Sequence, residues 1–242
     1  MTKPVYSTLR RFGYTSVGYI DDSLLVSDSY AECEQNIDCT KKLFEKLGFI
    51  VHEKKSVLHP CQRIHFLGFI IDSSAMKVYL PEEKCNAVIK SCCNLRDKST
   101  VKIRQLAEVI GKIISTFSAV EYGQLFYRKL ETAKIAALKD NYGDFDKNVL
   151  ITQDMKTELN WWVNNLRFQS RNIIIEEPNR VIYTDSSSQG WGLSYENVKI
   201  GERWTEDEKS YQINYLELLP VFYALKAVCS QLKKSTCKNH DR

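Results

Sequence analysis

The 242-residue sequence contains no run of apolar residues near the length of about 18 that a membrane-spanning helix requires. Its first residues also lack the apolar stretch of a secretory signal. We therefore expect a protein that is not secreted, does not enter a membrane, and resides in the cytoplasm, the nucleus or both. The sequence has no internal repeat or low-complexity stretch, which argues against a solenoid.

The eight cysteines show no regular spacing: no C-x-x-C pair occurs, and Cys92 and Cys93 are adjacent. A zinc site or a disulfide framework would require a more regular pattern. We expect reduced thiols that lie mostly in protein cores.

Hydrophobic residues make up 43% of the chain and charged residues 26%, which are the proportions of a globular protein. A disordered chain, a collagen and a coiled-coil rod are thereby excluded. The net charge of +4 indicates little, but residues 81–139 hold 11 Lys or Arg against 6 Asp or Glu. Such a segment could face a polyanion, although charge alone favours an ordinary solvated helix surface.

The first 80 residues alternate strand and helix patterns. Apolar runs at 17–20 and 23–26 flank Asp21 and Asp22, which predicts a hairpin with these two residues as its turn. Apolar residues at helical spacing over 33–47 predict a helix.

Gly48 is placed to end this helix. We then expect a strand at 49–51 and a second hairpin over 64–71.

Pro81 marks a change to helical patterns. One predicted helix has Ser99 or Thr100 as its N-cap, and another begins near Glu121. A third covers about 155–166, where Trp162 shares the apolar face.

Pro178 marks a second boundary. Strands are predicted at 181–184, 191–195 and 200–204, and a helix is predicted after Asn214.

Two adjacent carboxylates at a hairpin tip, Asp21 and Asp22, repel each other unless a cation neutralises them. Mg²⁺ prefers oxygen ligands, and two such ions about 3.5–4 Å apart can clamp the oxygens of a phosphoryl transfer. A site of that kind needs a third carboxylate from elsewhere. The dipeptide alone is also compatible with an ordinary Asp-rich turn.

Asp185 follows an apolar strand, and Glu217 lies in the helix predicted after it. The pair could form a two-ion nuclease site. Alternatively, Glu217 stands three residues after Asn214, close to the pattern of a capping box. Pro220 departs from an ideal helix, so we expect the helix either to begin later or to kink beside Glu217.

Tyr19-Ile20-Asp21-Asp22 resembles the Y-x-D-D motif of reverse transcriptases. Further segments that resemble this family follow in the same order as in its members. The next palm motif would be 47–51 with 53–56, and the primer grip 66–69. The thumb helices would include 103–106, 111–112 and 122–123, the connection would include 161–162, and an RNase H domain would start at 183–185. The resemblance is greatest to the reverse transcriptase and RNase H region of the Pol polyprotein of DIRS-type, gypsy-related retrotransposons.

This resemblance implies an α+β fold that is truncated at both ends. Residues 1–80 would form the C-terminal part of a polymerase palm, a hairpin plus a helix, and residues 81–140 a helical thumb. Residues 141–178 would form a short connection, and residues 179–242 the N-terminal part of an incomplete RNase H-like α/β domain.

The resemblance also implies the roles of individual residues. Asp21 and Asp22 would be catalytic and bind Mg²⁺, and Tyr19 would contact the primer end. Asp185 and Glu217 would be the catalytic metal ligands of the RNase H site.

Lys55 would lie near the incoming dNTP, and Gly68 would allow the backbone to approach the primer. A solvated lysine and a β-bulge are the respective alternatives. Arg104 and Lys112 in the thumb would contact nucleic acid.

The implied parent enzyme performs RNA-directed DNA synthesis and cleaves RNA in hybrids. Its partners would be an RNA/DNA template-primer, dNTPs and other parts of the Pol polyprotein. A catalytically inactive nucleic-acid-binding module and a non-functional remnant of a retroelement are the alternatives.

The family places another catalytic Asp well upstream of Y-x-D-D, and further Asp residues after the first RNase H helix. Only 18 residues precede Tyr19, none of them Asp, and the sequence ends at Asp241-Arg242. We therefore expect both metal sites to be incomplete.

We predict that the isolated chain incorporates almost no dNTP with Mg²⁺ or Mn²⁺. Lost positioning of a reacting group can remove roughly 7–11 kcal/mol of barrier reduction. A primer-extension assay measures this, and robust incorporation would contradict the prediction.

Overall fold

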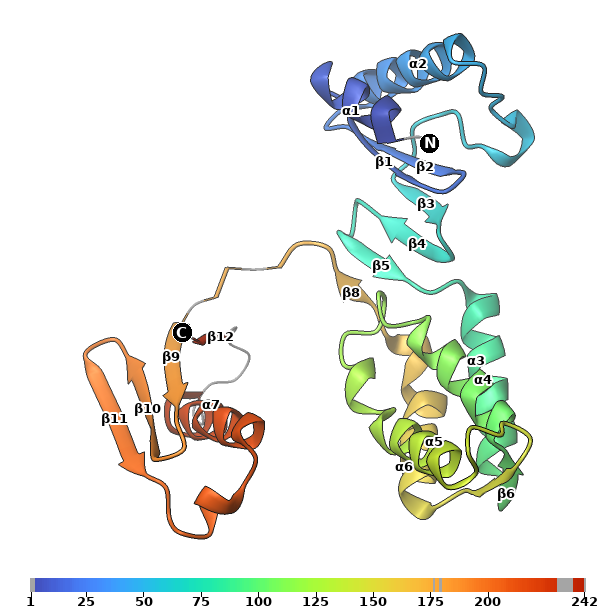
Figure 1. The fold of residues 1–242 in the computed structure, drawn as a ribbon. Helices are drawn as coiled ribbons and strands as arrows, with labels where there is room; N and C mark the ends of the chain where they lie inside the picture. Colours follow the sequence, from blue (N-terminus) through green and yellow to red (C-terminus); the bar gives the residue numbers. More distant parts are fainter. Residues whose placement is uncertain (1–2, 176, 179, 230–236, 242) are drawn as a thin grey trace. The chain divides into compact units, whose positions relative to one another are not determined.

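The computed structural model describes residues 3–175, 177–178, 180–229 and 237–241 (Figure 1). The chain divides into two compact units, Met1–Ile174 and Ile175–Arg242, which are described separately. Both contain helices and strands, so the predicted α+β class is confirmed.

The first unit begins with two helices that pack on one hairpin. These elements are α1 (Lys3–Arg11), β1 (Thr15–Tyr19), β2 (Asp22–Val26) and α2 (Tyr30–Lys46). The predicted helix is confirmed as α2: the Ser29 hydroxyl accepts a hydrogen bond from the Glu32 amide (3.3 Å) at its start. Gly48 follows its end with a φ of +80°, the left-handed conformation that suits glycine.

The strand predicted at 49–51 is wrong. Phe49 packs edge-on against Phe44, with ring centroids 5.5 Å apart, so this apolar segment contributes to the α1–α2 core without pairing to a strand. A short 3-10 turn, Glu53–Lys55, comes next.

The second predicted hairpin is confirmed and belongs to a larger sheet. Its strands β3 (Arg63–Phe66) and β4 (Phe69–Asp72) are followed by β5 (Lys77–Tyr79). A distant strand, β8 (Arg171–Asn172), pairs with β5 to give the order β3-β4-β5-β8.

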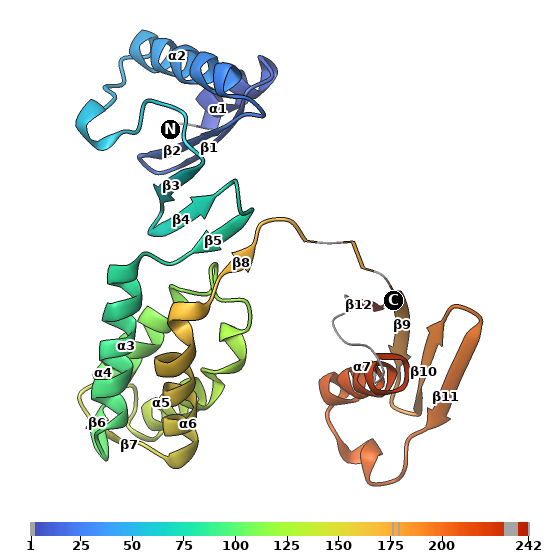
Figure 2. The ribbon, with the colours of Figure 1, turned by 180° about the vertical axis from the view of Figure 1, so that it is seen from behind.

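Four helices then form a bundle: α3 (Glu82–Arg96), α4 (Ile103–Ile114), α5 (Arg128–Asp140) and α6 (Gln153–Asn165). Figure 2 shows α3, α5 and α6 from behind. Leu106, Ile110 and Ile113 of α4 are at most 1% exposed, so they form the buried apolar face of this helix. Burying each such side chain stabilises the fold by about 1.5–3 kcal/mol.

Two predicted helix starts are wrong. Neither Ser99 nor Thr100 caps α4, because β6 (Thr100–Lys102) pairs with β7 (Asn148–Leu150) and delays the helix to Ile103.

Likewise, no α-helix begins near Glu121. The Trp162 indole nitrogen donates to the Phe126 carbonyl oxygen (2.7 Å), and a Cβ at Gly123 would lie 2.7 Å from the same ring. This packing of Trp162 holds the segment in a 3-10 turn, and α5 begins at Arg128.

The start of α5 carries no side-chain cap of its own. Glu158, a buried residue of α6, supplies one: its carboxylate accepts hydrogen bonds from the amides of Lys129 (3.0 and 3.1 Å) and Leu130 (3.1 Å). A carboxylate at a helix N-terminus satisfies amides that have no partner within the helix.

In its described residues, the second unit contains a four-stranded sheet, a short 3-10 turn (Glu208–Ser210) and an α-helix. Its elements are β9 (Arg180–Ser186), β10 (Gly190–Tyr195), β11 (Val198–Arg203), α7 (Ile213–Cys229) and β12 (Cys237–Asp241). The three predicted strands are confirmed, and β12 joins β9 in parallel to give the order β11-β10-β9-β12. Ile182, Leu193 and Ala224 form the core between the sheet and α7.

The predicted cap at Asn214 is wrong. The helix begins at Ile213, and the Gln212 carbonyl accepts from the amides of Tyr215 (2.9 Å) and Leu216 (3.1 Å). Pro220 lies inside α7 rather than delaying it. Pro220 cannot donate to the Leu216 carbonyl; burial of Leu216 and Ala224 maintains the helix.

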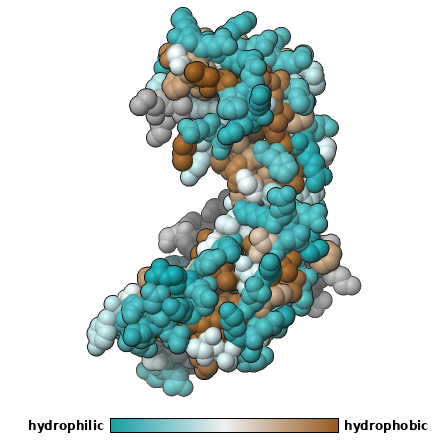
Figure 3. All heavy atoms as spheres, turned by 90° about the vertical axis from the view of Figure 1, so that its right-hand side faces the viewer, coloured by the Kyte–Doolittle hydropathy of each residue, from teal (hydrophilic) through white to brown (hydrophobic). Residues whose placement is uncertain are grey.

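Large apolar side chains also remain exposed, among them Leu218 and Phe222 on the outer face of α7. On the face drawn in Figure 3, hydrophobic atoms in brown reach the surface among hydrophilic ones. Within the described ranges, no helix is long and apolar enough to cross a membrane.

We predict that Glu158→Ala lowers the free energy of unfolding by about 1–3 kcal/mol, because it leaves buried amides without an acceptor. Glu108→Ala, which removes an exposed carboxylate from an i,i+4 ion pair, should change it far less. Urea unfolding measures both, and equal shifts would contradict the prediction.

Candidate metal and nucleic-acid site

The hairpin that carries the Asp pair is held against α1 by a tyrosine. The Tyr6 ring occupies the space where a side chain at Gly18 would lie, so the strand approaches α1 closely. The Tyr6 hydroxyl bonds to the Ser23 hydroxyl (2.5 Å). Since Gly18 and Ser23 are cross-strand partners, one side chain contacts both strands.

A buried amide ties the same hairpin to α2. The Asn36 side chain donates to the Thr15 carbonyl oxygen (3.2 Å), and the Thr40 hydroxyl donates to the Asn36 side-chain oxygen (3.2 Å). Asn36 is fully buried and Thr40 nearly so. Asn36 and Thr40 fix the start of β1, and Tyr6 fixes its end.

The predicted turn at Asp21-Asp22 is displaced by one residue. Tyr19 pairs with Asp22, so Ile20 and Asp21 form the turn and Asp22 begins β2. The Gly18–Ser23 pair beneath Tyr6 sets this register. Ile20 has a φ of +52°, a strained conformation for a β-branched residue.

Tyr19, Ile20, Asp21 and Asp22 are all exposed, at 57% for Tyr19 and 72% for Ile20. Strand alternation places Tyr19 and Asp22 on the face of the hairpin opposite to Tyr6, together with the exposed Val17. Among the described residues, β1 and β2 form a sheet of two strands, so their outer edges carry backbone groups without a ladder partner.

The structure places Lys55 in the exposed 3-10 turn Glu53–Lys55. Gly68 lies with Leu67 in the two-residue turn of the β3–β4 hairpin, and both have positive φ, +49° and +75°. This is the backbone of a tight hairpin turn, so the alternative of a β-bulge at Gly68 is wrong.

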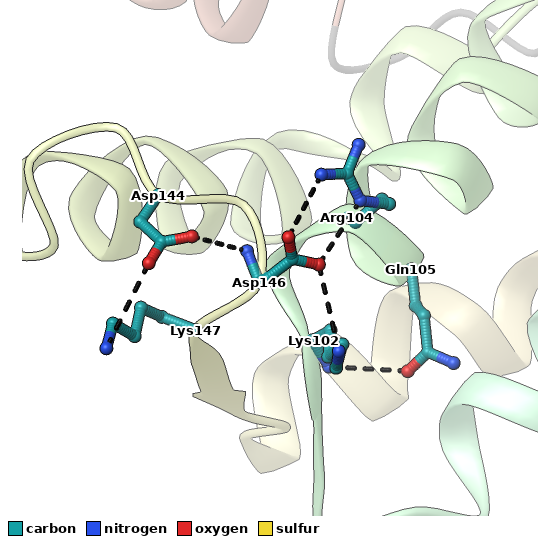
Figure 4. A network of polar contacts seen from close by, with 6 residues as sticks. All are labelled: Lys102, Arg104, Gln105, Asp144, Asp146 and Lys147. Atoms are coloured by element: carbon teal, nitrogen blue, oxygen red, sulfur yellow. Dashed lines mark hydrogen bonds and ion pairs between the residues drawn. The ribbon is translucent and has the colours of Figure 1, made fainter.

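Arg104, at the start of α4, engages the carboxylate of a residue on the adjoining loop before β7 (Figure 4). Its guanidinium bonds to both carboxylate oxygens of Asp146 (3.3 and 3.4 Å), and Lys102 lies 3.7 Å from the same group. These hydrogen bonds raise the pKa of Arg104 and lower that of Asp146. Arg104 is exposed, so it can still meet a second anion.

Lys112 is also paired. Its ammonium donates to Glu108 (2.7 Å) and to the Ser91 hydroxyl (3.0 Å), and the Lys112 hydrogen bond lowers the pKa of Glu108. Lys112 lines a shallow groove of about 220 Å³ between α3 and α4, with Asn94, Lys98 and Gln105 among the other residues.

Asp185 and Glu217 occupy different elements of the second unit. Asp185 is exposed near the end of β9, and alternation places it on the face opposite to the buried Ile182 and Thr184. It lines a concave surface of about 350 Å³ together with Glu202, and Glu217 does not line it. Glu217 is exposed on α7.

Exposed carboxylates such as Asp21 and Asp22 suit a hard divalent cation. Within the part of the chain that the structure describes, no cluster of three or more His, Cys, Asp or Glu side chains could hold a metal ion. Asp21 and Asp22 would therefore hold Mg²⁺ with few protein ligands. In the second unit, Asp185 pairs with Gly192 and Glu202 with Trp191, so strand alternation places these two carboxylates on opposite faces of the sheet.

Sequence reasoning missed the residues that support the hairpin, Tyr6 and Asn36. Each makes contacts to residues 12 or more positions away, and neither belongs to a motif. The glycine at 18 was a signal for close approach of another group to the strand.

A family model described as reverse transcriptase (RNA-dependent DNA polymerase) matches residues 1–71. No curated protein matches the chain. Solved structures of the foamy viral protease-reverse transcriptase match 99% of this chain at 18% identity, with TM-scores of 0.58 for the complex with RNA/DNA hybrid and 0.57 for a complex with dsDNA. The chain spans 32% and 48% of those chains, which is less than half of each. Its fold is therefore that of part of a reverse transcriptase.

We predict that Gly18→Ala lowers the free energy of unfolding by about 1–3 kcal/mol, because the added methyl group collides with the Tyr6 ring. Gly111→Ala is the control. It lies inside α4 with no atom within 4 Å of the new Cβ, and should stabilise the chain by about 0.5–1 kcal/mol. Urea unfolding distinguishes the two, and a stabilising Gly18→Ala would refute the packing described.

Proposed function

We propose that this chain is part of an RNA-directed DNA polymerase in which Asp21 and Asp22 bind catalytic Mg²⁺. The observation that carries this proposal is the exposed Tyr19–Asp22 turn on a hairpin anchored at both ends by Tyr6 and Asn36. The match of residues 1–71 to the reverse transcriptase family supports it.

In the complete enzyme, Mg²⁺ would supply charge stabilisation for nucleotidyl transfer. Asp21 and Asp22 would hold the metal, and Tyr19, on the same face as Asp22, would contact the primer end. A third carboxylate must come from another segment, and the open edges of β1 and β2 can accept a further strand.

The second unit would be the first part of an RNase H-like nuclease. Its β9, with Asp185 near the strand's end, and its α7, with Glu217 exposed, support this assignment. The template-primer would be an RNA/DNA hybrid or duplex DNA, as in the complexes of the foamy viral enzyme. A DIRS-type retrotransposon origin rests on the thumb motifs, including 103–106 and 111–112.

A nucleic-acid-binding module without catalysis is the second candidate. The excess of Lys and Arg over 81–139 favours it. Its affinity would fall with rising salt in proportion to the number of phosphates contacted. Arg104 is paired with Asp146, and Lys112 is paired with Glu108. These two cations would therefore bind phosphate more weakly than unpaired cations would.

The affinity of the chain for a labelled RNA/DNA hybrid, measured with and without Mg²⁺, separates the two candidates. We expect Mg²⁺ to tighten hybrid binding roughly fivefold or more, because that is the size of a typical coupling between two ligands. Asp21→Asn and Asp22→Asn should each abolish this gain in affinity. Asp28→Asn, an exposed acid beyond β2, should retain it. If neither Mg²⁺ nor the turn variants alter the affinity, simple electrostatic binding is the correct description.

A further inference from the structure

One lysine joins the Leu67–Gly68 turn to the helical bundle. Lys84 lies in the first turn of α3, and its ammonium sits over the face of the Phe69 ring, 4.3 Å from the ring centroid. Phe69 begins β4, immediately after the turn. The ammonium also lies beside Gly68, since a Cβ built there would be 3.6 Å away.

The same ammonium reaches the end of α4. It donates to the Ser115 carbonyl oxygen (2.9 Å), and Ser115 is the residue that caps the C-terminus of α4. The last carbonyls of a helix lack partners within the helix and carry partial negative charge, so a cation is favourable there. Lys84 therefore contacts α4 and β4 from a position on α3.

Neighbouring contacts make the attachment local and specific. Phe69 and Val78 pack on the core of the bundle, so the sheet already rests on the helices. That apolar contact does not by itself orient the turn, because apolar packing is non-directional. Lys84 adds a directed contact within one residue of Gly68.

We propose that Lys84 is a positioning residue that sets the orientation of the Leu67–Gly68 turn relative to α3 and α4. By resemblance to reverse transcriptases, residues 66–69 would be the primer grip of the proposed polymerase, and in that respect the inference rests on the proposed function. Lys84 would then determine where the bundle holds the primer end without itself binding a phosphate.

Hydrogen exchange of the intact chain tests the contact itself. Lys84→Met retains the apolar stem and loses the ammonium. We expect amides in 66–72 and 115–118 to exchange about fivefold faster or more, as for a local loss of stability, with α6 unchanged. Lys84→Arg should restore much of the protection. Lys90→Met, at an exposed site on the same helix, should match the wild type.

Uniformly faster exchange throughout the bundle, or no local change in Lys84→Met, would overturn the proposal. Affinity for the RNA/DNA hybrid over a salt series then tests the functional consequence. Lys84→Met should weaken binding without changing the salt slope, whereas loss of a phosphate contact would reduce the slope by about 1. If the wild type does not bind hybrid, the proposed function fails, and the exchange result still decides the role of Lys84.

Discussion

The close approach of the Tyr6 ring to Gly18 is the contact on which the candidate polymerase site depends. It leaves no room for a side chain at Gly18, near the end of β1, and it brings the Tyr6 hydroxyl to Ser23 on β2. The register of the hairpin follows from this contact, and the register places Asp21 in the turn and Asp22 at the start of a strand. Asn36 holds the opposite end. The directional contacts of the buried Tyr6 and Asn36 side chains thus hold the hairpin whose turn exposes the carboxylates.

Three cations of the helical bundle lie beside carboxylate or carbonyl groups. Arg104 contacts Asp146, Lys112 contacts Glu108, and Lys84 contacts the end of α4. Isolated surface ion pairs contribute little to stability, since exposed pairs are typically worth about 0.2–1 kcal/mol. They do orient the long side chains that take part in them.

Both units expose apolar surface next to their candidate sites. On the hairpin, Val17 and Tyr19 share the open face with Asp22, and on α7 the exposed Leu218 and Phe222 lie opposite the buried face. Exposed apolar patches commonly mark contacts with other segments or partners.

Local pattern in the sequence was sufficient for α2, α6, the β3–β4 hairpin and the three strands of the second unit, because apolar periodicity and nearby caps act over a few residues. It also identified Asp21 and Asp22 and their hairpin. Only the tertiary structure decided the hairpin register, the delayed starts of α4 and α5, and the pairing of β8 with β5. It also decided that Asp185 shares a concave surface with Glu202 rather than Glu217. Each of these depends on a partner far away in the sequence, such as Tyr6 for the register, Trp162 for α5 and β7 for α4, and no local pattern encodes such contacts.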